Sequence, residues 1–277
     1  MLNVFQATRY VVPLREGGSL PAVVDTDDGG LFVAKFRGAG QGAKSLVAEI
    51  LVARIARALA LPVPEIALIE LDESFGRTEP DPEIQDILKG SRGTNVGMRY
   101  LEGAFNFDPN ADRVAPELAA GIVWLDALVE NIDRTAKNPN LMWQDESLWL
   151  IDHGAALYFH HNWRTVDRDK PKRPFERIGD HVLLPVAGDL RDADARLSAL
   201  LGPSQLREIV ECLPDELLMD APAGVAPPFA SADDNRDAYA SYLEARLESP
   251  RPFAAEAARV QQQRRERPKD HRKGYRR

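Results

Sequence analysis

Residues 131–162 have the sequence NIDRTAKNPNLMWQDESLWLIDHGAALYFHHN, which carries more information about the protein than the rest of the chain. It places a carboxylate, Asp133, five residues before a carboxamide, Asn138, and ends an apolar run with a second carboxylate, Asp152. Hard cations such as Mg²⁺ prefer oxygen ligands, so Asn138 and Asp152 are candidate metal ligands, and Asp133 could accept the proton of an attacking hydroxyl. The spacing Asp-x-x-x-x-Asn alone is typical of ordinary polar loops. Together with Asp152 it predicts phosphoryl transfer.

A strand lysine and a helix glutamate precede this stretch. The sequence predicts an antiparallel meander with strands at 10–14, 20–25 and 31–36, separated by Gly-rich turns. Lys35 lies on the third strand, on the face opposite two phenylalanines. Apolar positions recur at helical spacing through residues 43–61, and Glu49 falls in the second turn, where it can pair with Lys35. Most strand lysines are merely solvated, but the order of these motifs favours a functional pair.

This order of motifs resembles the protein-kinase-like superfamily, in its HipA-like and phosphatidylinositol-kinase-like branch. NIDRTAKN followed by LWLIDHG is similar to the Asp-Arg loop and the Asp-x-Gly metal motif of type II phosphatidylinositol 4-kinases. PLREGGSLPAVV, AKFRGAGQG and GRTEPDPEIQDIL resemble the bacterial HipA-like kinase domain family. The resemblance covers about residues 8–245.

The resemblance implies a role for each matching residue. It implies that the glycine turn covers the phosphates of ATP, that Lys35 contacts them and that Glu49 orients Lys35. It also implies that Asp133 is the catalytic aspartate and that Asn138 and Asp152 bind Mg²⁺. The residues of the glycine turn are Gly17, Gly18 and Ser19.

Two departures separate the chain from eukaryotic protein kinases. The catalytic loop has Ile132-Asp133-Arg134 instead of His-Arg-Asp, and His153 stands where those enzymes carry phenylalanine. The substrate choice and regulation of eukaryotic protein kinases therefore cannot be inferred for this chain.

A short apolar run at 94–105, TNVGMRYLEGAF, is the expected connection between two lobes. In a two-lobed kinase this connection pairs its backbone with adenine, so Met98, Tyr100 and Leu101 are candidate ATP contacts. Met98 and Tyr100 are equally typical of the core of an edge strand. Backbone atoms would make the contact, so side-chain identity does not decide between these readings.

The expected fold class is α+β, a two-lobed protein-kinase-like fold with a small antiparallel-sheet N-lobe and a mostly helical C-lobe. We place the N-lobe at 1–100, the C-lobe at 101–250 and a basic, disordered tail at 251–277. The helices expected in the C-lobe are 116–130, 192–201, 205–212 and 235–247. Residues 159–189, rich in His, Pro, Arg and Lys, occupy the position of a mobile activation or substrate-recognition loop.

Charge is unevenly distributed along the 277 residues. The chain has a net charge of −8, but residues 259–277 hold nine Lys/Arg and only two Asp/Glu. The tail has few apolar residues to bury and could bind an anionic partner. The acidic body argues against nucleic acid at the catalytic domain. The single cysteine, Cys212, excludes a disulfide framework. The sequence shows neither a secretory signal nor an apolar run of membrane length. We therefore expect a cytoplasmic protein.

The sequence thus predicts an ATP- and Mg²⁺-dependent kinase that transfers the γ-phosphoryl group to a hydroxyl, that of Ser or Thr in a protein. Three alternatives share the motifs: a small-molecule or phosphoinositide-type kinase, an adenylyl transferase that moves AMP, and a non-catalytic nucleotide-binding partner module. The acceptor, the oligomeric state and any regulation by autophosphorylation are not encoded in a recognisable pattern.

Overall fold

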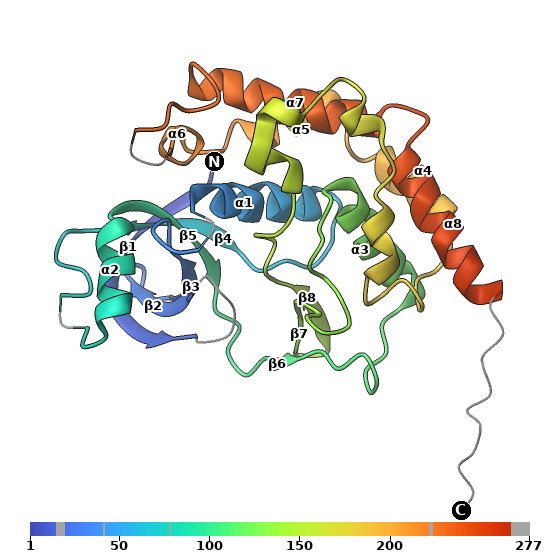
Figure 1. The fold of residues 1–277 in the computed structure, drawn as a ribbon. Coiled ribbons are helices and arrows are strands. Elements are labelled where there is room, and N and C mark those ends of the chain that lie inside the picture. The colour runs from blue at the N-terminus through green and yellow to red at the C-terminus, as the bar shows by residue number, and fades with distance from the viewer. Residues whose placement is uncertain (15–19, 41, 78, 222–223, 267–277) are drawn as a thin grey trace, which may run out of the picture.

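The chain forms a β-barrel and a helical region that are joined through a long central helix (Figure 1). The computed structural model describes residues 1–14, 20–40, 42–77, 79–221 and 224–266. No helix within these residues is both long and apolar enough to cross a membrane.

Five strands close the barrel in the order β1-β2-β3-β5-β4. They are β1 (Asn3–Pro13), β2 (Ala22–Thr26), β3 (Leu31–Lys35), β4 (Ile66–Leu71) and β5 (Gly93–Arg99). The expected antiparallel sheet is therefore wrong in one respect, because the sheet closes into a barrel in which β1 also pairs with β4 in parallel. The pairing joins residues 3–6 to residues 67–70, a long-range contact that local strand patterns do not reveal. Predicted strands 10–14, 20–25 and 31–36 correspond to β1, β2 and β3.

The barrel encloses its own small core. Alternate side chains of β3 point inward, so Phe32 and Ala34 are fully buried while Lys35 faces outward. Helix α2 (Pro82–Gly90) covers the barrel with Ile84 and Leu88. Gly38 is required where the loop after β3 meets the end of α2, since a Cβ there would lie 2.7 Å from the carbonyl oxygen of Ile87.

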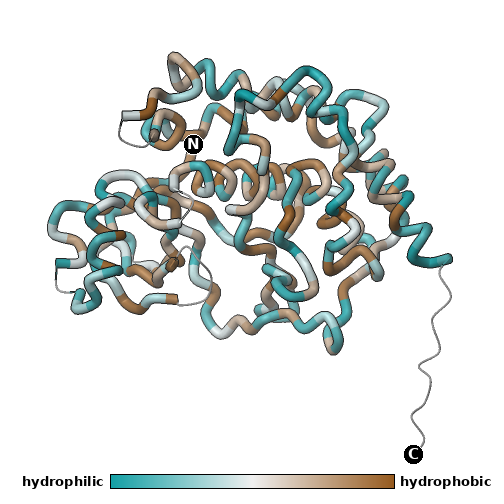
Figure 2. Tube along the Cα trace, viewed as in Figure 1, coloured by the Kyte–Doolittle hydropathy of each residue, from teal (hydrophilic) through white to brown (hydrophobic). Residues whose placement is uncertain are grey.

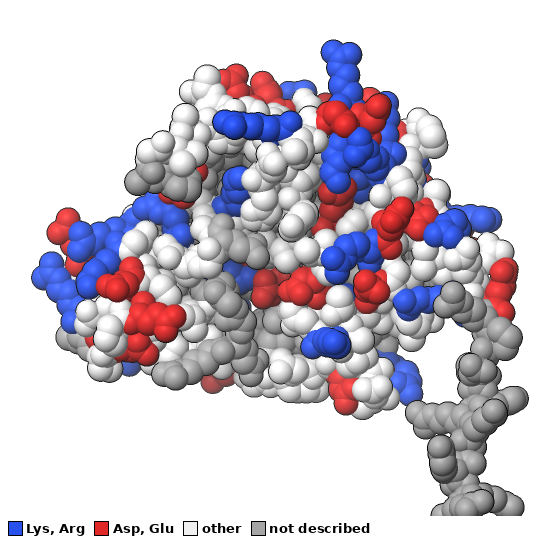
Figure 3. All heavy atoms as spheres, in the orientation of Figure 1, with Lys and Arg blue, Asp and Glu red and all other residues white. Residues whose placement is uncertain are grey.

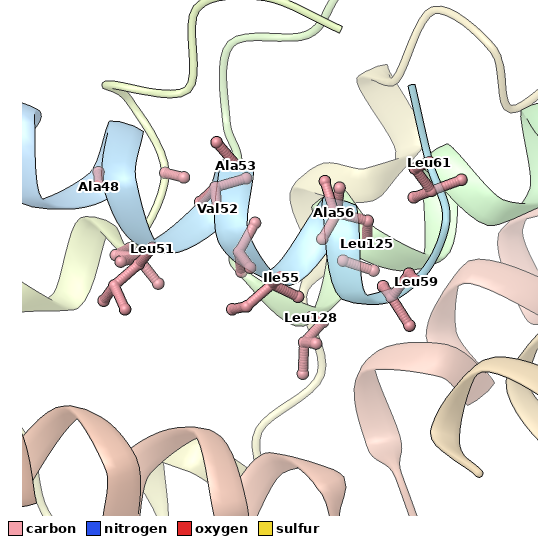
Figure 4. Packing of buried hydrophobic residues seen from close by; sticks show 14 of the residues in the cluster. Ala48, Leu51, Val52, Ala53, Ile55, Ala56, Leu59, Leu61, Leu125 and Leu128 are labelled. Carbon is pink, nitrogen blue, oxygen red and sulfur yellow. The ribbon is translucent and has the colours of Figure 1, made fainter. Parts of the chain in front are cut away.

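Helix α1 (Ala43–Ala58) is the central helix, and it is buried along most of its length. Figure 2 shows it as largely hydrophobic, as expected for a helix covered on all sides. Ile55 and Ala56 lie against Leu125 and Leu128 of α3 (Pro116–Leu128) in one continuous core (Figure 4). Although α1 lies between the barrel strands β3 and β4 in sequence, its packing is shared with the helical region.

The helical region also contains a small three-stranded sheet, in the order β6-β7-β8, that carries the decisive stretch. Its strands are β6 (Phe105–Asn106), β7 (Leu141–Gln144) and β8 (Ser147–Leu150). The remaining helices are α4 (Leu190–Ser198), α5 (Pro203–Val210), α6 (Asp215–Leu218), α7 (Ala232–Leu247) and α8 (Pro252–Glu266). Each of the four helices expected from the sequence is present, with ends shifted by a few residues.

The segment expected to be a mobile loop is instead a chain of 3₁₀ helices anchored to the core. They are η1 (Tyr158–Thr165), η2 (Lys170–Lys172) and η3 (Glu176–Asp180). Phe159, Phe175 and Ile178 are buried, and Phe159 stacks on Tyr242 with ring centroids 3.6 Å apart. Arg246 of α7 donates a hydrogen bond of 3.1 Å to the carbonyl oxygen of Pro171.

The predicted disordered tail is wrong for Pro252–Glu266, which form helix α8. Phe253 is fully buried and packs edge-on against Trp124 of α3, with centroids 5.5 Å apart. Arg251 holds the helix start through hydrogen bonds of 2.7 and 2.9 Å to Asp194. A few apolar residues on one helical face suffice to dock this segment. The rest of the predicted tail, residues 267–277, lies outside the described residues.

We expect Phe253→Ala to lower the free energy of unfolding by about 3–5 kcal/mol, because it empties a buried aromatic site and removes the contact with Trp124. Urea denaturation measures the change. The matched control is Gln263→Ala on the exposed face of α8, which should shift stability by no more than about 0.5 kcal/mol. Equal stability of the two variants would mean that α8 is not docked.

Candidate active site

Lys35, Glu49 and Asp152 meet between the barrel and the helical region. The ammonium of Lys35 donates to Glu49 Oε1 and, at 2.6 Å, to Asp152 Oδ1. The backbone N–H of His153 also donates to Glu49 Oε1, at 2.8 Å. A strand, a helix and the segment after β8 thus converge on one cation. The pairing of Lys35 with Glu49 that the sequence predicted is present.

The three side chains differ in how far they are exposed to solvent, and therefore in whether they can contact a ligand. The side chain of Glu49 is 2% exposed and that of Lys35 is 15% exposed, whereas that of Asp152 is 44% exposed. Asp152 therefore has an accessible carboxylate oxygen, while Glu49 is enclosed behind the lysine. Glu49 is suited to hold Lys35 in place, and Asp152 is suited to contact a ligand.

The pKa values of the group follow from burial and charge. Burial works against the charged form of Lys35, but the carboxylates of Glu49 and Asp152 outweigh it and raise the pKa of the ammonium. Burial would likewise raise the pKa of Asp152, yet the neighbouring Lys35 holds it below its ordinary value. For Glu49 burial prevails over the attraction of Lys35 and raises its pKa. The site therefore keeps a charged lysine beside an ionised Asp152.

Gly154 allows helix α1 to approach this close. A Cβ at Gly154 would lie 3.3 Å from Glu49 Oε1 and 3.4 Å from the Cβ of Ser45. A Cβ there would require the Glu49 side chain to shift by a few tenths of an ångström. The glycine of the Asp-x-Gly order thus favours the close approach of α1.

The loop at 131–140 brings the predicted catalytic aspartate to the same area. Asn138 Nδ2 donates to Asp133 Oδ2 at 2.7 Å, so the two residues predicted from the sequence do lie together. Asn140 Nδ2 lies 3.4 Å from Asp133 Oδ2 and 3.5 Å from the carbonyl oxygen of Asp152. Asn140 therefore connects the two carboxylate segments. Sequence reasoning missed it, and the only signal was a second asparagine in Asn-Pro-Asn.

Arg134 fixes the loop from inside the protein. Its Nε donates to Asp126 Oδ2 of α3 at 2.6 Å, and both side chains are fully buried. The same guanidinium donates to the carbonyl oxygen of Asn140 and, at 3.2 Å, to His153 Nδ1. His181 Nε2 bonds Asp126 Oδ2 at 2.8 Å. These four side chains form a buried polar network beneath Asp133 and Asp152.

The network sets the charge states of its members. Burial would raise the pKa of Asp126, but the guanidinium of Arg134 holds it well below its ordinary value of 3.8. Burial, reinforced by Arg134, lowers the pKa of His153 to about 3. Asp126 is therefore an anion and His153 a neutral imidazole at pH 7. Nothing in the sequence pattern singled out Asp126, apart from its being an acid within the apolar run of a helix.

The other predicted site residues lie at the edges of this arrangement. Met98 lies near the end of β5, paired with Val33 and Ile66. Tyr100 follows the strand, 38% exposed, and its N–H donates to the carbonyl oxygen of Leu31 at 2.9 Å. Leu101 begins the connection to the helical region. Their contact with adenine stays a prediction. The predicted phosphate-covering turn, Gly17, Gly18 and Ser19, lies outside the described residues.

The oxygen donors fit a hard cation such as Mg²⁺. Asp152 offers a partly exposed carboxylate, and Asn140 links its segment to the hydrogen-bonded pair of Asp133 and Asn138. No group of three or more His, Cys, Asp or Glu side chains in the described ranges could hold a metal by itself. Two or three protein oxygens completed by phosphates and water are what Mg²⁺ sites in phosphoryl-transfer enzymes use.

Comparisons with known proteins identify a family and a structure with a similar fold. The model of the HipA-like kinase family matches residues 9–223. No curated protein matches the sequence significantly. Among solved structures, the fold is similar to the crystal structure of a Helicobacter pylori proinflammatory kinase, CtkA, with a TM-score of 0.52 and 11% sequence identity over 92% of this chain and 97% of that one.

We expect Asp126→Asn to cost about 3–5 kcal/mol of stability at neutral pH, because it leaves the buried Arg134 without its carboxylate. The folded pKa of Asp126 lies below its ordinary value, so its contribution is present above about pH 4 and is lost as the pH falls further. Urea denaturation from about pH 6 to about pH 3 should therefore give a steeper loss for the wild type than for the variant. The exposed Asp192→Asn serves as the control, and parallel pH profiles for wild type and Asp126→Asn would contradict the assignment.

Proposed function

Since the chain belongs to the HipA-like kinase family, we propose that it transfers the γ-phosphoryl group of ATP, with Mg²⁺, to the hydroxyl of a serine or threonine in a protein. The observation that carries this proposal is the convergence of Lys35, Glu49 and Asp152 from three separate segments, with Asp133 and Asn138 connected to the Asp152 segment through Asn140. A cation, an exposed carboxylate and a second, hydrogen-bonded carboxylate are the parts that phosphoryl transfer needs.

Each side chain has a role that follows from its place. Lys35, held by the enclosed Glu49, would contact the phosphates of ATP. Asp152, with its exposed oxygen, and Asn138 would hold Mg²⁺, which supplies charge neutralisation at the phosphates. Asp133 would orient the attacking hydroxyl and accept its proton, and the hydrogen bond from Asn138 restrains its carboxylate. Catalysis by such a site is mostly positioning and electrostatic stabilisation.

The decisive experiment is incubation of the purified protein with γ-labelled ATP and Mg²⁺, followed by mass spectrometry of the protein and of added acceptors. Phosphate on Ser or Thr supports the proposal. A parallel reaction with α-labelled ATP distinguishes an adenylyl transferase, which would transfer the label with AMP. Label in a small molecule alone would redirect the proposal to that class of kinase, and binding of ATP without any product would indicate a partner module.

Asp152→Asn should lower the rate of phosphoryl transfer by several orders of magnitude and leave the fold intact. The reason is that it weakens a proposed Mg²⁺ ligand whose side chain is exposed to solvent. The rate with labelled ATP is the measurement, and circular dichroism checks the fold. Asp145→Asn in the exposed turn between β7 and β8 is the matched control and should retain full activity. Turnover at the wild-type rate in Asp152→Asn would remove this residue from the mechanism.

Lys35→Met and Glu49→Gln should impair the same catalytic step, because the role proposed for Glu49 is to hold Lys35. The double variant should therefore lose little more activity than either single variant. Single-turnover rates for the four proteins, each checked for folding, give the coupling. Losses that multiply fully would show that the two residues act independently.

A further inference from the structure

Residues 164–177, here called the basic segment, stand out in an acidic protein. They hold six Lys/Arg and three Asp/Glu in a chain of net charge −8. The segment spans the end of η1, all of η2 and the start of η3. Figure 3 shows Lys and Arg side chains gathered where the 3₁₀ helices cross the face that is drawn. The Lys and Arg residues of the basic segment are Arg164, Arg168, Lys170, Lys172, Arg173 and Arg177.

Four of these cations have no carboxylate partner among the residues that the structure describes. Lys172 pairs with Glu248 at 3.1 Å and Arg173 with Asp167 at 2.7 Å. The other four carry no ion pair, and three of them are exposed. Surface cations that are already paired gain little from a further anion, whereas unpaired ones remain available. The four are Arg164, Arg168, Lys170 and Arg177.

The backbone beneath these cations is held in place. The neighbouring Pro171, Phe175 and Ile178 are buried, and Arg246 donates to the carbonyl oxygen of Pro171. A surface that is ordered before binding loses less conformational entropy when a partner docks. The backbone of the basic segment is therefore already ordered before a partner binds.

Both ends of the surrounding chain are fixed at the candidate active site. The chain leaves the site at Asp152 and returns at His181, which bonds Asp126 and forms a β-bridge with Thr135 of the catalytic loop. The N–H of Val182 then donates to the carbonyl oxygen of Arg134 at 3.1 Å. The basic segment is thus part of a longer chain segment whose two ends both contact the loop that carries Asp133 or the residues next to it.

We propose that the basic segment is the docking surface for an acidic stretch of the protein acceptor, an inference that rests on the kinase function proposed above. The unpaired cations bind carboxylates that flank the hydroxyl to be phosphorylated. Electrostatic attraction of this kind raises the association rate and selects acidic partners over basic ones.

An acidic protein fits this surface better than a nucleic acid does. Asp167, Asp169 and Glu176 interrupt the row of cations, and a continuous phosphate backbone would meet each of them. The negative charge of the chain as a whole also repels a long polyanion. The carboxylates of a protein partner are separate from one another, so they can contact the cations of the basic segment without meeting its three acidic residues.

The test uses the full chain and two fluorescein-labelled peptides of about 25 residues, long enough to reach ~80 Å when extended. Each has a central serine; one carries glutamates on both sides and the other carries lysines. The variant is Arg164→Glu/Arg168→Glu/Arg177→Glu. The control with the same change in net charge is Arg77→Glu/Arg191→Glu/Arg196→Glu, at positions outside the basic segment. Fluorescence anisotropy gives binding, and γ-labelled ATP gives transfer to the same peptides.

We expect the acidic peptide to bind and accept phosphate, and the basic-segment variant to lose about tenfold or more in both Kd and kcat/KM, with little change in the control. Binding by the wild type should weaken as salt is raised above about 0.1 M. The ATP-induced thermal shift checks that the nucleotide site of each variant is intact.

Some results would overturn the inference, and one would overturn the proposed function instead. Equal transfer to both peptides, or equal loss in the two variants, would show that the basic segment does not select the acceptor, although the kinase function would stand. Tighter binding of a single-stranded RNA oligonucleotide, lost in the same variant, would assign the surface to nucleic acid. Binding of the acidic peptide with no transfer to any acceptor would mark failure of the proposed function itself.

Discussion

The buried ion pair between Arg134 and Asp126 is the interaction on which the site depends. It has no exposed surface, so its attraction must offset the loss of hydration of two charges. The guanidinium achieves this by also donating to the carbonyl oxygen of Asn140 and to His153. One side chain thereby ties helix α3, the catalytic loop and the Asp-His-Gly motif together. Because every partner lies on a different segment, moving any one of them exposes a charge to an apolar interior.

His153 connects this buried network to the charged group at the surface of the site. Its ring accepts a hydrogen bond from Arg134, and its backbone N–H donates to Glu49, which in turn accepts from Lys35. The barrel contributes Lys35, so its position relative to the helical region is fixed by polar contacts as well as by the packing of α1. A phenylalanine at 153 could keep the backbone contact but not the one to Arg134. The departure from the pattern of eukaryotic kinases therefore has a structural use here.

Local patterns predicted the parts of this structure that depend on neighbours in sequence. The lysine strand, the glutamate helix and α3 follow from periodicity, and the meeting of Lys35 with Glu49 follows from their order along the chain. Closure of the barrel depends on a parallel pairing of residues more than sixty positions apart, which no local pattern reports. Helix α8 was missed because its composition is polar and its apolar residues form only a short buried stripe. Composition describes a whole segment, whereas docking needs only one face.

Backbone strain explains why the direction of Asp152 could not be predicted. Asp152, Asn140, Glu130 and Leu157 all have left-handed backbone angles, with φ between 50 and 56°, a conformation that costs about 1–3 kcal/mol when the residue is not glycine. Each lies where tertiary contacts can hold it. The carbonyl oxygen of Asn140 accepts from Arg134, and the N–H of Leu157 donates to the carbonyl oxygen of Val129 at 2.7 Å.

Glu130 is held in the same way, by Tyr242 and Arg246, each at 3.1 Å from its Oε1. These backbone angles are therefore accompanied by contacts from other residues, which lie in the same loop for Asn140 and on α7 for Glu130. A motif can locate a carboxylate in the chain, but Asp152 meets Lys35 only in the folded protein, because the two residues are 117 positions apart.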